Sequence, residues 1–171
     1  MTGERLSAFA CVLGTVLFSA GCTGEKGSAP KRYAVTSVID GDTIDIDDGR
    51  RIRLLGIDTP ERFTDPECYG DEAFNHLAQL LGDSKVELEY DIEREDSFGR
   101  TLAWVRTSEL FVNAQMVDDG FACVLIIPPN GAEYEAFLES LESGAQSANR
   151  GLWGACGNCD VPALQAGALS R

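Results

Sequence analysis

Positive charge is scarce in this 171-residue sequence. Fourteen Lys and Arg residues stand against 28 Asp and Glu residues, which leaves a formal net charge of −14 at pH 7. Proteins that bind nucleic acids usually present a basic surface. The overall charge therefore argues against a polyanionic partner unless cations are concentrated at one site, and any such function must rest on particular residues.

Histidine and long apolar runs are scarce as well. His76 is the only histidine, and its place between Phe74 and Leu77 in a predicted helix favours a helix-edge position over a catalytic base. The apolar run over residues 6–20 is shorter than the roughly 20 residues that a membrane-spanning helix needs. No internal repeat is visible. A content of 44% hydrophobic and 25% charged residues is typical of one globular domain and excludes wholesale disorder.

The N-terminal region predicts export. The apolar run follows Arg5 and ends in Ser19-Ala20-Gly21-Cys22, which resembles the bacterial lipoprotein signal, in which the cysteine is lipidated and becomes the new N-terminus. We therefore expect a signal peptide over 1–22, a lipid on Cys22 and a flexible tether over 23–31. A protein anchored in the cell envelope follows, or a secreted one if an ordinary signal peptide is cut nearby.

Four cysteines remain after the signal: Cys68, Cys123, Cys156 and Cys159. In an exported chain they predict disulfides, and four cysteines allow three pairings between which the sequence does not choose. The Cys156-Gly-Asn-Cys159 spacing also permits a redox pair or a zinc site. A redox pair normally opens a helix after a strand, and zinc would need a second pair of ligands, so structural disulfides are favoured.

Short β-branched segments alternate with turns from residue 33 onward. Strands are predicted over 33–39, 43–46, 51–57, 85–90 and 101–106, and helices over 71–81, over 113–119 and from Tyr134 to the turn at Gly151. Five strands with helices between and after them indicate a small α+β domain around a β-barrel. The domain is expected over 32–155, and a cysteine-containing tail over 156–171.

Acidic residues gather at two predicted strand ends. Asp40-Gly-Asp42-Thr43 and Asp58-Thr59-Pro60-Glu61 place several carboxylates on loops held by rigid strands, and calcium prefers hard oxygen ligands of this kind. Each motif taken alone could be only a turn. A bound cation would also invert the local charge, so that an acidic site could still hold a phosphodiester.

Two arginines make that chemistry more specific. Arg53 lies five residues before Asp58, and Arg100 follows a Phe-Gly turn; guanidinium groups match phosphate oxygens at two points. Phosphodiester cleavage needs charge neutralised in the transition state, an oriented water and a stabilised leaving oxygen. One cation, the two guanidinium groups and a carboxylate meet these needs, and Glu61 is the candidate that positions or deprotonates the water.

These motifs together resemble the staphylococcal nuclease (thermonuclease) family. The matching segments, in family order over about residues 33–155, are 38–43, 53–61, 69–73 and 96–105, with further matches at 112–113, 120–122 and 151–153. The resemblance implies an OB-type five-stranded barrel with about three packed helices. It also implies a calcium-dependent, monomeric endonuclease that cuts DNA and RNA with little sequence specificity and leaves 3′-phosphate ends.

The resemblance also implies a role for each site residue. Asp42 and Asp58 would be carboxylate ligands of calcium, and Thr59 would add its main-chain carbonyl. Arg53 and Arg100 would hold the scissile phosphate, and Glu61 would be the general base. Asp40 would lie beside the metal without binding it directly.

Two departures from the family pattern concern the substrate. Ser97 stands where the best-known member has a lysine that assists phosphate binding, and residues 126–129 (Ile-Ile-Pro-Pro) replace a tyrosine pair that flanks the base. Stacking contributes roughly 1–3 kcal/mol per base, so weaker base binding is expected. The alternative function is a non-catalytic OB-fold envelope lipoprotein that binds nucleic acid or protein. Domains of that kind usually lose the arginines or acids that this sequence keeps.

Overall fold

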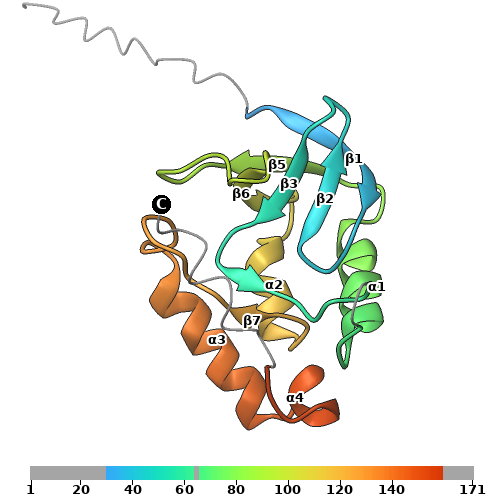
Figure 1. Ribbon diagram of the computed structural model, residues 1–171, viewed down its shortest axis with the longest axis vertical. Coiled ribbons are helices and arrows are strands. Elements are labelled where there is room, and N and C mark those ends of the chain that lie inside the picture. The colour runs from blue at the N-terminus through green and yellow to red at the C-terminus, as the bar shows by residue number, and fades with distance from the viewer. Residues whose placement is uncertain (1–29, 64–65, 160–171) are drawn as a thin grey trace, which may run out of the picture.

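Five strands close into a barrel, which forms the upper half of the molecule in Figure 1. The structure is a computed structural model that describes residues 30–63 and 66–159. The barrel strands are β1 (Arg32–Val38), β2 (Thr43–Ile46), β3 (Arg51–Leu54), β5 (Lys85–Glu89) and β6 (Thr101–Arg106), in the order β1-β2-β3-β6-β5. All neighbours are antiparallel except β3 and β6, which are parallel. The predicted five-stranded barrel is confirmed.

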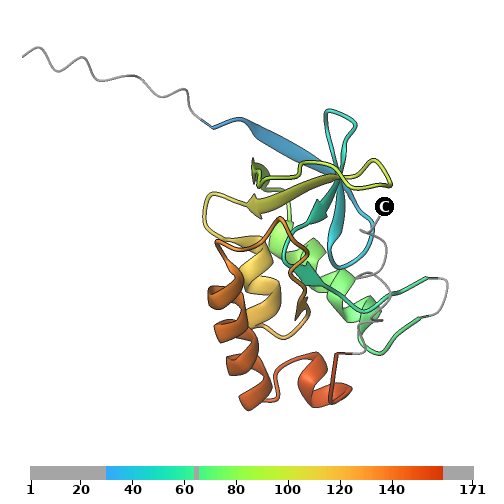
Figure 2. The same cartoon turned by 60° about the vertical axis from the view of Figure 1, so that its left-hand side comes forward.

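The helices pack together on one side of the barrel (Figure 2). They are α1 (Gly70–Leu81), α2 (Val112–Asp118), α3 (Glu135–Ser147) and the short α4 (Leu152–Ala155). Helix α2 contacts α1, α3 and strand β6, so it joins the barrel to the helical layer. Within the described ranges, none of the helices combines the length and the hydropathy needed to cross a membrane.

The core follows from the alternating strands and the apolar helix faces. Ile44 and Ile52 of the barrel and Leu77 of α1 are fully buried. Trp104 of β6 is 1% exposed and meets Tyr134 edge to face, with ring centroids 4.8 Å apart. Burial of apolar surface at roughly 25 cal/mol per Å² stabilises this interior.

One buried polar residue ties α2 to the barrel. Asn113 has no solvent exposure; its Oδ1 accepts a hydrogen bond from the Val105 N–H at 2.8 Å, and its Nδ2 donates to the Leu55 carbonyl at 2.8 Å. Buried polar groups are tolerated when they are bonded in this way. Asn113 thereby fixes the chain just after β3, where the chain turns.

The prediction of one continuous strand over 51–57 is wrong. Strand β3 ends at Leu54, and a separate strand β4 (Ile57–Asp58) pairs with the short β7 (Cys123–Val124). Gly56 makes the turn at φ 73°, a conformation that favours glycine, and a Cβ there would lie 2.5 Å from the Trp104 ring. The turn carries Asp58 away from the line of β3.

The last helix is shorter than predicted. It ends at Ser147, and Asn149 (φ 50°) and Gly151 (φ 53°) then turn the chain into α4. The apolar pattern continues into α4, where Leu152 is 1% exposed, so periodicity alone does not indicate where the helix ends.

Two disulfides join the segment after α4 to the domain. Cys68 is bonded to Cys156 and Cys123 to Cys159, with Cα–Cα distances of 6.0 and 6.2 Å. The prediction of structural disulfides is confirmed, and one of the three pairings is now assigned. The signal peptide, Cys22 and the tether up to residue 29 lie outside the described residues, as does the tail from residue 160.

Candidate active site

A buried arginine links the two acidic motifs. Asp42 lies just before β2, Arg53 lies in β3, and Asp58 ends β4. Arg53 Nη1 lies 2.8 Å from Asp42 Oδ2, and Arg53 Nη2 lies 2.6 Å from Asp58 Oδ1. The three residues are 5%, 9% and 8% exposed. The structure therefore places together the two carboxylates that the sequence suggested as metal ligands.

The Gly56 turn gives this guanidinium two further acceptors. Arg53 Nη1 donates to the Leu54 carbonyl at 3.1 Å and to the Ile57 carbonyl at 2.9 Å. Both carbonyls belong to the turn that separates β3 from β4. The orientation of the guanidinium is thus set by the backbone as well as by the two carboxylates.

Asp42 is held on both of its carboxylate oxygens. Thr43 Oγ1 donates to Oδ1 at 3.0 Å, while the N–H and Oγ1 of Thr59 donate to Oδ2 at 3.2 Å each. Asp40 Oδ1 accepts the Asp42 N–H at 3.1 Å, so Asp40 lies beside the carboxylate pair. Gly41 permits this approach, because a Cβ there would lie 2.7 Å from Thr59 Oγ1.

The pKa values at this site are raised by burial. Burial raises the pKa of Asp42 to about 7, against the opposing charge of Arg53. Burial raises the pKa of Asp58 as well, again opposed by Arg53, and the carboxylates of Glu61 and Glu67 add to the rise. One guanidinium therefore does not compensate the negative charge gathered here.

The donor set fits a hard divalent cation. Asp42 and Asp58 offer carboxylate oxygens and Thr59 a neighbouring carbonyl, and calcium takes six to eight oxygen ligands with flexible geometry. A cation at these residues would supply the positive charge that Arg53 alone does not provide. No nitrogen or sulfur ligand belongs to this set, which argues against a soft transition metal.

Glu61 follows on the loop after Thr59 and is held by Glu67. The Glu61 N–H donates to Glu67 Oε2 at 2.9 Å, and the Glu67 N–H donates to the Glu61 carbonyl at 2.7 Å. Burial raises the pKa of the Glu61 carboxyl, helped by the charges of Asp40 and Glu67 and opposed by Arg53 and Arg100. Glu61 is therefore within electrostatic reach of both arginines.

Arg100 and Arg53 line the same cavity. Arg100 Nε donates to Asp96 Oδ2 at 2.7 Å, and its N–H donates to Asp96 Oδ1 at 2.9 Å, which orients the side chain through the turn before β6. The cavity measures about 590 Å³. Its apolar lining comprises Leu54, Leu55, Ile57, Phe98, Leu102, Leu125 and Ile127, and its acidic lining comprises Glu93, Glu95 and Asp96.

This arrangement can bind an anion beside an apolar group. The anion would lie between the two guanidinium groups, and the Phe98 ring beside it is 80% exposed and has the Arg100 guanidinium 5.5 Å from its centroid. A volume of this size is typical of small-ligand sites. The site can therefore hold a phosphate with an attached planar ring.

Sequence reasoning missed several residues that shape the site. Glu67, which holds Glu61, and Leu125, which lines the cavity, were not expected there. Ile127 of the segment that replaces the tyrosine pair lines the cavity, whereas Ile126 packs against the core. The sequence feature that could have pointed to Glu67 is its place just before the matched segment 69–73. Nothing in the local pattern pointed to Leu125.

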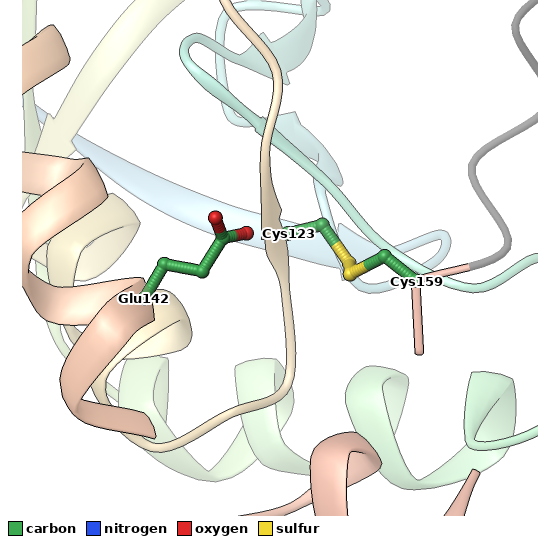
Figure 3. Close-up of side chains that lie close together, drawn as sticks. All are labelled: Cys123, Glu142 and Cys159. Carbon is green, nitrogen blue, oxygen red and sulfur yellow. A yellow bond between two sulfur atoms is a disulfide. The ribbon is translucent and has the colours of Figure 1, made fainter. Parts of the chain in front are cut away.

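The sulfurs of the four cysteines are cross-linked, so they do not support the zinc interpretation. Cys123, Cys159 and Glu142 lie with their ligand atoms within 4.8 Å of one another (Figure 3). The two sulfurs are joined in a disulfide and offer no thiolate. Glu142 instead accepts the Val124 N–H at 2.8 Å, which supports β7 from α3. The two cysteines of Cys156-Gly-Asn-Cys159 bond to different partners, so they do not form a redox pair with each other.

His76 lies away from these carboxylates and arginines. Its Nε2 is 2.9 Å from Asp119 Oδ2, and its ring stacks on Phe121 with centroids 3.8 Å apart. The contacts join α1 to the end of α2. The expected helix-edge position agrees with this placement.

Known proteins are similar to this chain in sequence. Residues 51–155 match the family described as "Staphylococcal nuclease homologue". The chain is 40% identical over 127 residues to the thermonuclease of Staphylococcus intermedius (71% of this chain, 75% of that protein). It is 35% identical over 136 residues to the thermonuclease of Staphylococcus hyicus (76% of this chain, 80% of that protein). Endonuclease YncB of Bacillus subtilis (strain 168) is 32% identical over 126 residues, 70% of this chain and 60% of that protein.

The family match covers more than half of the chain and includes Arg53, Asp58, Glu61 and Arg100. Asp42 lies before the matched range and is joined to it by the ion pair with Arg53. Together with the closed five-stranded barrel, these findings show that the chain belongs to the staphylococcal nuclease family.

Proposed function

We propose that this chain is an exported, calcium-dependent endonuclease that cuts DNA and RNA with little sequence specificity and leaves 3′-phosphate ends. Membership of the family makes it a nuclease that hydrolyses phosphodiester bonds. The single observation that carries the finer proposal is the buried Asp42–Arg53–Asp58 cluster beside a cavity that Arg53 and Arg100 both line.

Each residue has a role that its surroundings support. Arg53 and Arg100 hold the scissile phosphate and stabilise the charge that grows on it. Glu61 accepts a proton from the attacking water, and its carboxyl lies within electrostatic reach of Arg53 and Arg100. Asp42, Asp58 and the Thr59 carbonyl would hold calcium, which supplies positive charge at the phosphate oxygens.

Low sequence specificity is supported by the cavity walls. Asn130 is the amide side chain in the lining, and both ends of the amide are occupied: Oδ1 accepts the Glu93 N–H and Nδ2 donates to the Glu93 carbonyl, each at 2.8 Å. Apart from the two arginines, Ser97 and the three acidic side chains, the rest of the lining is apolar. Apolar surfaces stack on any base, whereas distinguishing one base from another needs free donors and acceptors at its edge.

Export is supported by the sequence before the domain and by the disulfides. Disulfides persist in oxidising compartments outside the cytoplasm. A lipid on Cys22 would hold the domain at the envelope membrane, and a monomer is expected. Mass spectrometry of the mature protein tests signal cleavage and the lipid together: an N-terminus at Cys22 with added acyl mass is expected, and an unmodified chain that starts elsewhere would contradict the anchor.

Calcium should raise the thermal stability of the domain through Asp42. A ligand that binds only the folded state adds about 2.7 kcal/mol at a concentration 100 times its dissociation constant. Thermal unfolding of the wild type with calcium and with chelator should show this shift, and Asp42→Asn should lose it. Asp45→Asn is the matched control, because Asp45 pairs with Arg51 on the surface. The absence of any calcium shift in the wild type, with no DNA cleavage, would favour the non-catalytic alternative.

Substrate binding should depend only weakly on salt. Arg53 and Arg100 are the cations in the cavity lining, so the slope of log affinity against log salt should be shallow, about −2 at roughly 0.9 per phosphate contact. Glu93→Lys with Glu95→Lys should steepen the slope by about one to two units and tighten binding. Asp83→Lys with Glu139→Lys changes the net charge equally at exposed positions outside the cavity and should leave the slope unchanged. A steep wild-type slope would show that cations elsewhere contact the substrate.

A further inference from the structure

The two disulfides meet beside the calcium-ligand residues. Residues of both disulfides line a second, small cavity of about 100 Å³. Its lining comprises Asp58, Thr59, Pro60, Glu67, Asn158 and all four disulfide cysteines. Cys156, Asn158 and Cys159, at the end of α4 and after it, therefore line the same cavity as Asp58 and Thr59.

One disulfide supports Asp58. Strand β4 pairs with β7 in a register that sets Asp58 opposite Cys123. Each of these strands has only two residues, so the ladder itself supplies few hydrogen bonds. The bond from Cys123 to Cys159 fastens the far side of β7, and Glu142 holds the neighbouring Val124 N–H.

The other disulfide supports Glu61. Glu67 binds both the N–H and the carbonyl of Glu61, and Cys68 is the next residue along the chain. The loop closes tightly at its base, since a Cβ on Gly70 would collide with the Glu61 carbonyl. The bond from Cys68 to Cys156 ties this base to the end of α4.

We propose that the two disulfides position Asp58 and Glu61, so that the nuclease loses its catalytic rate when a dithiol reduces them while its barrel stays folded. This inference rests on the proposed function for the catalytic readout. The barrel interior is built from residues such as Ile44, Ile52 and Val86, to which neither disulfide belongs.

The reduction step is balanced by the dithiol. Each S–S bond accepts two electrons and two protons and becomes two thiols, while the dithiol closes its own S–S bond. Cys68 is exposed and can be reached by a small reductant. After reduction, Glu61 keeps its hydrogen bonds to Glu67, and Asp58 keeps the β4–β7 ladder and its ion pair with Arg53, but the covalent links that fix the loop and β7 are gone.

The test compares two double variants with the oxidised wild type, all below their unfolding temperatures. The first pair is Cys68→Ser and Cys156→Ser in one chain, and the second pair is Cys123→Ser and Cys159→Ser in one chain. The first pair should lower kcat by about 10²-fold with KM within a few-fold, since small misplacements of a catalytic group have effects of that size. The second pair should weaken calcium binding by about tenfold, as measured by the calcium-induced shift in unfolding temperature, in addition to lowering kcat. Dithiothreitol added to the wild type should reproduce both losses.

Val86→Ala separates positioning from general stability. Val86 is fully buried in the barrel, so its truncation lowers the unfolding temperature but should leave kcat and calcium binding unchanged. If a paired variant fails to fold, hydrogen exchange of the reduced wild type answers the same question. The amides of Glu61 and Glu67 should exchange faster, while those of β2 and β3 should not.

Three outcomes are distinguishable. Loss of kcat in the reduced, folded protein with unchanged Val86→Ala kinetics supports the inference. Full kcat and unchanged amide exchange after reduction would overturn it. An oxidised wild type that cleaves nothing would overturn the proposed function instead, and the calcium shift and amide exchange would still decide whether the disulfides position these residues.

Discussion

Replacing Arg53 with alanine is expected to abolish cleavage and to destabilise the domain most strongly in the presence of chelator. The guanidinium pairs with two buried carboxylates, of Asp42 and Asp58, at 2.8 and 2.6 Å. Removal of one partner from a buried ion pair costs about 3–5 kcal/mol because the other charge is left unpaired. The rate should fall by about 10³-fold or more, since each lost phosphate donor costs about 10²–10³.

Calcium should separate these two effects of Arg53→Ala. A bound cation compensates the same carboxylates, so it should restore much of the lost stability, but it cannot supply the missing phosphate donors. Denaturant unfolding and single-turnover cleavage, each with calcium and with chelator, measure the two quantities. Arg51→Ala is the matched control: its side chain is 50% exposed and pairs with Asp45, so a change of about 0–1 kcal/mol and an unchanged rate are expected. Cleavage by Arg53→Ala at the wild-type rate would remove the arginine from the mechanism.

Glu61→Gln is expected to lower kcat by about 10²–10⁴-fold, the usual contribution of a general base. The amide is isosteric with the carboxyl but does not accept the proton. The main-chain bonds to Glu67 remain, and the metal set of Asp42, Asp58 and Thr59 is untouched. The calcium-induced stabilisation should therefore be retained, in contrast to Asp42→Asn.

Single-turnover kinetics with calcium near saturation measure this loss directly. Glu72→Gln, at an exposed position in the first turn of α1, removes one carboxylate at a position with no assigned role in the reaction and should cleave normally. If Glu61→Gln kept the wild-type rate, the base would have to be another group. If it lost the calcium shift instead, Glu61 would be a metal ligand.

The elements that the sequence predicted well are those with local signals. The barrel strands alternate in polarity and are separated by Asp-Gly turns, and α1 has a regular apolar face that ends at Gly82, so periodicity located them. The Arg53–Glu61 motif placed the acidic and basic groups because its residues are close in the chain as well as in space.

The features that escaped prediction depend on contacts between distant segments. The run over 51–57 alternates at first and then holds two adjacent leucines before Gly56, and only the Trp104 ring shows why the chain must turn at Gly56. Strand β7 has two residues, too few for a periodic signal. The disulfide pairing is set by the approach of Cys156 to the Glu61 loop and of Cys159 to β7, and no local pattern in the chain indicates that approach.

The disulfide pairing also has a consequence for resistance to proteolysis. The bond from Cys68 to Cys156 closes a loop with a sequence separation of 88, and Arg100, α2 and α3 lie within it. A protease that cuts one peptide bond anywhere between these two cysteines leaves the two pieces covalently joined. Between Cys123 and Cys156, both cross-links span the cut. A molecule nicked in this loop would keep all its catalytic residues on one covalent particle.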